Sequence, residues 1–185
     1  MICPYLLYYD SKMPCVHLFL SSLCVSYTCY MYKSVNGWVF LGREFIKEMQ
    51  VDETKIRVRY QETDQMGVVY HANYIVWFEV GRTHLIRQSG FSYRELEKQG
   101  ILLPVVDVHC KYRAPARYED EIKILTKIDE LTPYKIIFSY EVKRDSDDAL
   151  LAYGSTTHMW VNRDMRPTNV KRAYPELYET LTQLL

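Results

Sequence analysis

The sequence predicts a domain of the α+β class, built from about five strands and one long helix. Two observations lead to this prediction. Four segments after Met49 alternate between apolar and polar residues with a period of two, and a fifth segment is apolar on both faces. The stretch that begins near residue 73 is apolar all round over its first turns, which favours a helix enclosed by a sheet over one lying on a surface.

The first half of the predicted domain contains a strand, the long helix and a short second helix. Residues 55–60 alternate between basic and apolar side chains, as in a strand. The helix is predicted over about Asn73–Gln88, with Asn73 as its N-cap and Gly90 as the left-handed residue that stops it. Gly81 would allow a strand to approach this helix closely. Residues 92–100 carry the capping-box pattern Ser-x-x-Glu and predict a short helix that ends at a glycine.

Four further strands and a terminal helix account for the second half. In residues 106–112, 122–128 and 136–142, apolar side chains alternate with polar ones, so each strand is expected to bury one face. Residues 149–162 are apolar on both faces, which is typical of a central strand. Leucines on one stripe of residues 175–185 predict a closing helix.

Composition limits the function classes. The chain of 185 residues contains 23 Lys and Arg residues and 23 Asp and Glu residues, so it shows no electrostatic sign of nucleic-acid binding. Cys110 is the only cysteine after residue 48, and a single cysteine cannot form an internal disulfide, which favours a cytoplasmic protein. The histidines show no metal-ligand spacing with cysteine or acidic residues, so no metal is implied.

Residues 1–48 form a separate appendage before a domain that comprises residues 49–185. Met13–Tyr32 contains no Asp, Glu, Lys or Arg and is long enough to span a bilayer, but a proline, several serines and several tyrosines dilute its apolar character. We therefore interpret residues 1–48 as a translated leader, with synthesis naturally beginning at Met49. A membrane anchor and a flexible tail are the alternatives. A membrane partner is accordingly not expected.

Residues 60–79 carry the features of an active site. Asp64 lies just before a glycine turn, in which Gly67 can adopt a positive φ or approach a ligand closely. The long helix begins a few residues later, so its unpaired amides and positive end point back toward the loop. A carboxylate that faces such donors suits acyl transfer. The simpler interpretation is that Asp64 only caps a turn.

The pattern Asp64-x-x-Gly67-x-Val-Tyr-His-x-x-Tyr74, together with Tyr112–Ala116 downstream, resembles the 4-hydroxybenzoyl-CoA thioesterase branch of the hotdog-fold superfamily, and within it the YbgC-like acyl-CoA thioesterases. The resemblance covers about residues 54–170. It implies an antiparallel sheet of about five strands wrapped around a long central helix. It also implies a homodimer or homotetramer, an active site at the dimer interface and an acyl-CoA substrate.

The resemblance assigns roles to individual residues. Asp64 would be the nucleophile that attacks the thioester carbonyl, or the general base that activates a water. The oxyanion would be held by the backbone amide seven positions later, at His71. Because these groups supply both attack and oxyanion stabilisation, no metal or organic cofactor is expected. Glu79 is the alternative catalytic acid, although Arg82 three residues later favours a structural ion pair.

The substrate contacts follow from the same motifs. Gly67, Tyr70, Tyr74 and Arg113 are the candidate substrate-binding residues, with Arg113 directed to the phosphates of coenzyme A. Packing is the simpler interpretation of both tyrosines and of the His71 side chain. A short-chain or aromatic acyl group is expected. Two other functions remain open, namely an acyl-thioester dehydratase or hydratase of the same fold and a non-catalytic acyl-CoA-binding protein.

Overall fold

The computed structural model describes residues 30–34, 37–41 and 50–185, in a chain that divides into two compact units, Met1–Glu48 and Met49–Leu185. In the first unit, β1 (Tyr30–Ser34) pairs antiparallel with β2 (Gly37–Leu41). Most of residues 1–48 lie outside the described residues. The prediction of a translated leader, and the alternatives of a membrane anchor or a flexible tail, therefore stay untested. Among the residues described, no helix combines the length and the apolar character needed to cross a membrane. The predicted cytoplasmic location stays a prediction.

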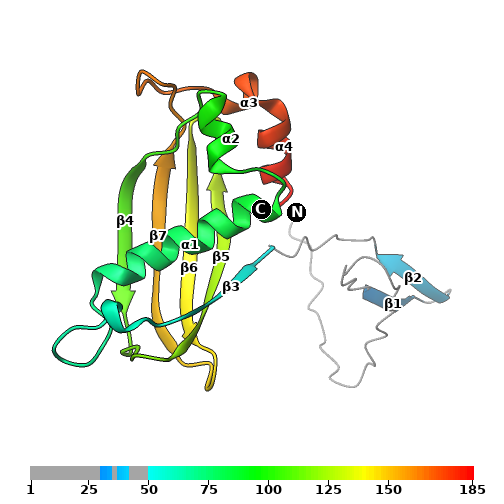
Figure 1. Ribbon diagram of the computed structural model, residues 1–185. Coiled ribbons are helices and arrows are strands. Elements are labelled where there is room, and N and C mark those ends of the chain that lie inside the picture. The colour runs from blue at the N-terminus through cyan, green and yellow to red at the C-terminus, as the bar shows by residue number, and fades with distance from the viewer. Residues whose placement is uncertain (1–29, 35–36, 42–49) are drawn as a thin grey trace, which may run out of the picture. The chain divides into compact units, whose positions relative to one another are not determined.

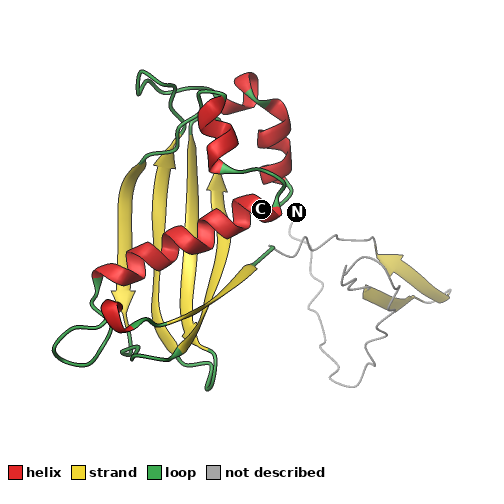
Figure 2. Cartoon of the chain, in the orientation of Figure 1, coloured by secondary structure: helices red, strands yellow, loops and turns green. Residues whose placement is uncertain are grey.

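The second unit is a five-stranded antiparallel sheet with one long helix across one of its faces (Figure 1). Three short helices gather at one end of this sheet (Figure 2). The strand order is β3-β5-β6-β7-β4, so β3 and β4 are the edge strands. The predicted α+β class and five-stranded antiparallel sheet are confirmed. The elements are β3 (Asp52–Arg57), α1 (Ala72–Gln88), α2 (Tyr93–Lys98), β4 (Val105–Tyr112), β5 (Glu121–Leu131), β6 (Lys135–Arg144), β7 (Leu150–Met159), α3 (Val170–Ala173) and α4 (Pro175–Thr182).

Helix α1 packs closely on the sheet because its inner face combines large apolar side chains with one glycine. Trp77 and Phe78 are fully buried, and the Phe78 ring stacks on Tyr140 of β6 with centroids 4.3 Å apart. A Cβ atom at Gly81 would collide with the side chain of Thr126 on β5. The predicted close approach of a strand at Gly81 is therefore confirmed, and contact with the sheet fixes the direction of α1.

The outer face of α1 differs from the prediction of a helix enclosed on all sides. Val76 and Val80 are 48% and 38% exposed, so the sheet of one protomer covers only part of this apolar helix. The edge strand β4 differs in the same way. Val106 and Val108 are 56% and 41% exposed, although the alternating sequence predicted a buried face. The alternation shows which side chains share a face, but none of the described residues covers that face of the strand.

The start of α1 also differs from the prediction, because Asn73 is not its N-cap. The helix begins at Ala72, and His71 at the N-cap position already has helical dihedral angles of φ −52° and ψ −34°. Asn73 thus lies within the first turn, where its side-chain amide donates to the Glu62 carbonyl at 2.8 Å. The main chain of residues 70–72 turns into the helix without a side-chain cap.

The glycine signals in this part of the chain are confirmed. Gly90 follows α1 with φ +89°, and Gly100 follows α2 with φ +87°. Ser92 caps α2, because its hydroxyl accepts the Glu95 amide at 3.3 Å. The Glu95 carboxylate accepts from this hydroxyl at 2.7 Å and not from the Ser92 amide, so the predicted capping box forms only in its N-cap half. The predicted strand ends are less accurate. Strand β3 stops at Arg57, and Tyr60–Glu62 form a short 3₁₀ helix instead.

Candidate active site

The loop that carries Asp64 is a tight antiparallel hairpin. Thr63 and Val69 face each other in a β-bridge, and the Asp64 amide donates to the Val68 carbonyl at 2.9 Å. The Gly67 amide closes the turn on the Asp64 carbonyl at 2.9 Å. Gly67 has φ +70°, with no atom within 4 Å of the position that a Cβ would take, so its backbone angle and not lack of space requires glycine here.

The Asp64 carboxylate is half-buried and makes one hydrogen bond to its own loop. Oδ1 accepts the Met66 amide at 2.8 Å, so the turn-capping interaction considered as the simpler interpretation is present. Oδ2 has no hydrogen-bond partner among the described residues. The turn therefore orients the carboxylate and leaves one oxygen available for a substrate or a water.

The entry of α1 presents an unpaired backbone donor beside this hairpin. The Tyr70 amide donates to the Glu62 carbonyl at 2.8 Å, which brings the two arms of the hairpin together. The next amide, that of His71, has no acceptor within the described part of the chain. Such free donors at a helix start attract negative charge. The His71 amide thus has the properties that the predicted oxyanion donor requires.

Tyr112 anchors the next peptide group, the one between His71 and Ala72, and no sequence pattern indicates this role. Its hydroxyl donates to the His71 carbonyl at 3.0 Å, which ties the end of β4 to the start of α1. The Tyr112 ring also meets the Tyr74 ring edge-on, with centroids 5.2 Å apart. The hydrogen bond to His71 joins positions 41 residues apart in the sequence, so only the pairing of β4 near the helix start could have indicated it.

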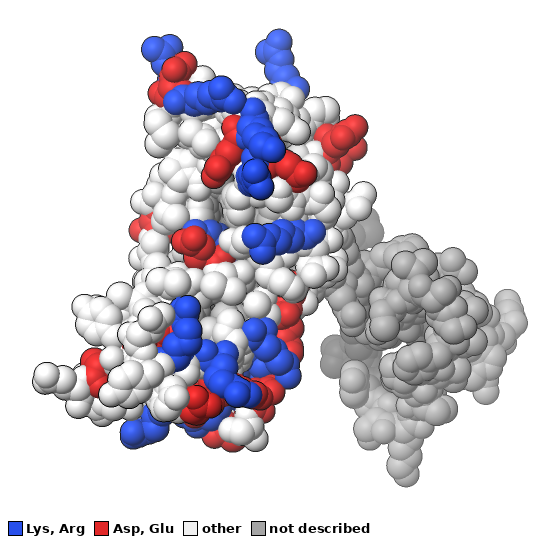
Figure 3. Space-filling model, viewed as in Figure 1, with Lys and Arg blue, Asp and Glu red and all other residues white. Residues whose placement is uncertain are grey.

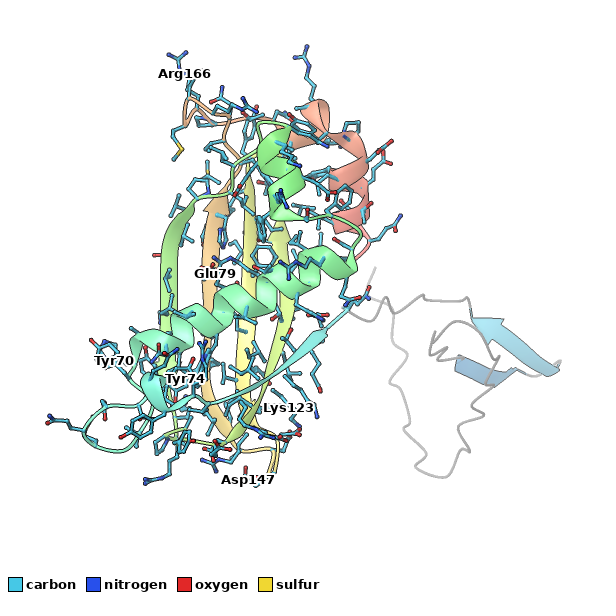
Figure 4. All side chains as sticks on the ribbon, in the orientation of Figure 1. Tyr70, Tyr74, Glu79, Lys123, Asp147 and Arg166 are labelled. Atoms are coloured by element: carbon cyan, nitrogen blue, oxygen red, sulfur yellow. The ribbon has the colours of Figure 1, made fainter. Side chains whose placement is uncertain are left out.

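The two candidate aromatic residues occupy different environments (Figure 4). Tyr74 is 3% exposed, and its hydroxyl accepts the Ala116 amide at 3.2 Å. Burial raises the pKa of Tyr74. Tyr70 is 48% exposed beyond the start of α1, with its ring 4.2 Å from that of His71. Tyr74 therefore packs as a core side chain next to the site, whereas the Tyr70 ring is accessible to a ligand.

Arg113 is directed away from the Asp64 hairpin. It donates to the Tyr153 hydroxyl at 3.0 Å, and its guanidinium lies 5.2 Å from the centre of the Tyr153 ring. Gly154, the residue after Tyr153, faces Phe78 of α1. Because successive residues of a strand point to opposite faces, Tyr153 lies on the other face of the sheet, beside a depression of about 650 Å³. The structure does not bring Arg113 together with Asp64 and His71.

Glu79 forms the intrahelical ion pair that the sequence indicated. Its side chain is 67% exposed, and Oε2 lies 3.3 Å from the guanidinium of Arg82, whose side chain is 11% exposed. Glu79 lies about two turns along α1 from His71, on the same helix as Tyr74 (Figure 4). The two candidate acids thus occupy separate positions, Asp64 on the hairpin and Glu79 on the middle of the helix.

No group of three His, Cys, Asp or Glu side chains suited to a metal ion occurs among the described residues. On the face shown in Figure 3, basic and acidic side chains of the second unit are interspersed. The site therefore offers a carboxylate, backbone donors and aromatic rings as its chemical groups.

Comparison with known proteins identifies the family. Residues 58–181 match the family model described as the thioesterase-like superfamily. The chain is 40% identical over 129 residues to "Putative acyl-CoA thioesterase YneP" of Bacillus subtilis (strain 168), covering 69% of this chain and 93% of that protein. It is 34% identical over 87 residues to the acyl-CoA thioester hydrolase YbgC of Escherichia coli O6:H1, covering 47% and 65%.

A solved structure agrees with these sequence relatives. The DHNA-CoA thioesterase of Staphylococcus aureus superposes with a TM-score of 0.70 at 35% identity, covering 72% of this chain and 90% of that chain. These relatives confirm the predicted hotdog fold and the predicted enzyme class, a thioester hydrolase. The chain belongs to the thioesterase-like superfamily.

Proposed function

We propose that the protein is an acyl-CoA thioesterase that hydrolyses the thioester of a short-chain or aromatic acyl-CoA, with Asp64 as its nucleophile or general base. The observation that carries the proposal is the hairpin of residues 62–70, which leads from a carboxylate with one free oxygen to the unpaired His71 amide. The names of YneP and YbgC, and the DHNA-CoA substrate named for the S. aureus enzyme, support an acyl-CoA substrate.

Two mechanisms agree with this geometry. As a nucleophile, Oδ2 of Asp64 attacks the thioester carbon, the C–S bond breaks, and coenzyme A leaves as its thiolate. Water then hydrolyses the mixed anhydride to the free acid and restores Asp64. As a general base, Asp64 takes a proton from water, the hydroxide adds to the carbonyl carbon, and the proton passes to the leaving sulfur. Each mechanism releases one thiol and one carboxylic acid.

The His71 amide is the proposed oxyanion donor in both mechanisms. Negative charge develops on the thioester oxygen as the carbon becomes tetrahedral, and a fixed N–H at the helix start stabilises that charge more than it stabilises the neutral substrate. Tyr112 holds the His71 carbonyl, which belongs to the next peptide group, and so restrains the backbone on one side of the His71 amide. Tyr70 is the exposed side chain next to this donor and is the proposed contact for the acyl group.

We also infer that the protein is a homodimer, or a homotetramer built from such dimers, with two copies joined along β4. An edge strand with exposed apolar side chains favours pairing with another copy. Side chains on α1 and on the Asp64 loop are also apolar and exposed, which supports an interface next to the proposed site. The exposed large apolar residues on β4, on α1 and on the segment between Asp64 and α1 are Met66, Tyr70, Val76, Val80, Val105, Val106, Val108 and Tyr112.

Release of free thiol from a panel of acyl-CoA substrates tests the proposed function. Asp64→Asn is expected to lower kcat by at least about 10²-fold, because an amide can neither attack nor accept the proton. Glu79→Gln is the matched control and should retain most of the activity. The opposite result would move catalysis to the helix. Hydration of a double bond without thiol release would indicate a hydratase, and retention of acyl-CoA without turnover would indicate a binding protein.

A further inference from the structure

Glu62 is a buried carboxylate two residues before Asp64, and the proposed mechanism gives it no chemical step. The residue is only 4% exposed, although the 3₁₀ turn that carries it joins the edge strand β3 to the Asp64 hairpin. A buried carboxylate is unfavourable unless hydrogen bonds from the protein replace those of water. The donors that surround Glu62 therefore indicate what it holds together.

Both carboxylate oxygens of Glu62 accept hydrogen bonds within the protomer. Oε2 accepts the Arg59 amide at 2.7 Å, and Oε1 accepts the Arg59 guanidinium at 2.9 Å and the Trp77 indole N–H at 3.1 Å. Burial alone would raise the pKa of Glu62, but the hydrogen bonds from Arg59 and Trp77 outweigh burial and lower it. An ionised carboxylate thus connects the end of β3 to α1.

The main-chain carbonyl of Glu62 makes two more connections. It accepts the Tyr70 amide at 2.8 Å, which closes the hairpin, and the Asn73 side-chain amide at 2.8 Å, which comes from the first turn of α1. Tyr70 directly precedes His71 in the chain. One residue therefore links the strand exit, both arms of the Asp64 hairpin and the first two turns of the helix.

We propose that Glu62 is a positioning residue, which holds the Asp64 carboxylate and the His71 amide in their reactive arrangement by fixing the hairpin to α1. This role rests on the proposed function. Glu62 does not act on the substrate itself, since its oxygens are buried and face donors of the protein. A displacement of the reacting groups by about 1 Å lowers the rate on the order of 10²-fold. A residue that fixes the hairpin to α1 is therefore expected to affect turnover.

Glu62→Gln tests the tether with little change in side-chain shape. The new NH₂ group must replace either Oε2, which accepts the Arg59 amide, or Oε1, which accepts the Arg59 guanidinium and the Trp77 indole, so at least one hydrogen bond is lost. We expect kcat to fall about 10- to 100-fold, with KM within about twofold of the parent value. Glu121→Gln is the matched control, because Glu121 pairs with Arg57 on the exposed surface of the adjacent strand. Its kcat should not change.

Hydrogen exchange provides a readout that does not depend on turnover. Amides of residues 62–71 should exchange faster in Glu62→Gln than in the parent protein or in Glu121→Gln, while those of β6 stay unchanged. In a chain that already carries Asp64→Asn, Glu62→Gln should lower the residual rate by a smaller factor than in the parent background, because only the His71 amide is left to position. A merely structural role would produce the same loss in both backgrounds.

The outcomes separate this inference from the proposed function. If Glu62→Gln folds and keeps both its kcat and the slow exchange of the hairpin, the positioning role is wrong. If Glu62→Gln does not fold, Trp77→Phe removes one donor and retains an aromatic ring. A fall in kcat for Trp77→Phe that is smaller than about 10- to 100-fold, at constant KM, then supports the role. Unchanged kcat and unchanged hydrogen exchange of the hairpin amides overturn it. A parent protein that hydrolyses no acyl-CoA would refute the proposed function, while the exchange comparison would still decide whether Glu62 fixes the hairpin.

Discussion

Replacing Tyr112 by phenylalanine is expected to lower kcat about fivefold and to leave KM almost unchanged. The substitution removes one neutral hydrogen bond, from the Tyr112 hydroxyl to the His71 carbonyl at 3.0 Å, and keeps the ring that packs against Tyr74. Such a bond contributes about 0.5–1.5 kcal/mol. Tyr112 is 46% exposed, so water can replace the hydroxyl in part. A loss of about 1 kcal/mol in transition-state stabilisation corresponds to about fivefold in rate.

Initial rates of thiol release over a range of acyl-CoA concentrations separate kcat from KM for this variant. Tyr134→Phe is the control, because Tyr134 is similarly exposed at 47% and its hydroxyl accepts only a long bond of 3.4 Å from Asn169. A raised KM at constant kcat would make Tyr112 a contact for the substrate and not a support for His71. If kcat falls equally in Tyr134→Phe, the effect is not specific to the hydrogen bond between Tyr112 and His71.

Three further predictions concern stability and domain organisation. Gly81→Ala should lower the free energy of unfolding by about 1–2 kcal/mol in urea titrations, because the new methyl group meets Thr126; a stabilised variant would contradict the packing described. Burial lowers the pKa of His158 to about 4, so the neutral side chain contributes stability above pH about 6.5. This stability, up to about 3 kcal/mol, is lost as the pH falls toward about 4. His158→Gln should make the free energy of unfolding less dependent on pH in urea titrations. A chain that begins at Met49 should fold and match the full chain in activity per site, since the second unit contains the whole candidate site; an unfolded or inactive product would show that residues 1–48 contribute.

Signals that depend on the local backbone could be predicted from the sequence. Gly67 and Gly90 adopt positive φ where a turn and a helix end require it, and Ser92 caps α2 by accepting the amide three residues later. The close approach at Gly81 could be predicted as well, because a glycine on the apolar face of a helix is typical of a close contact with a neighbouring element. The fold class followed from the same kind of information, since periodicity is a property of each segment by itself.

Features that depend on partners far away in the sequence could not be predicted in this way. Asn73 has the residue type of an N-cap, but the Glu62 carbonyl 11 positions earlier engages its side chain, and the chain is already helical at His71. The anchoring role of Tyr112 depends on a contact across 41 positions, and the burial of Glu62 depends on Trp77, 15 positions away. Neither contact produces a periodic pattern in the sequence.

The exposed face of β4, which the sequence predicted to be buried, lies next to residues of the proposed chemistry. Tyr112 contacts the His71 carbonyl and also belongs to the apolar strand whose predicted burial the protomer does not provide. If a second copy covers this strand, it covers the support of the oxyanion donor as well. Hydrogen bonds from a fixed amide stabilise a developing charge more strongly where water is excluded, because the local dielectric constant is lower. Association along β4 would thus strengthen the proposed oxyanion site without adding a catalytic group.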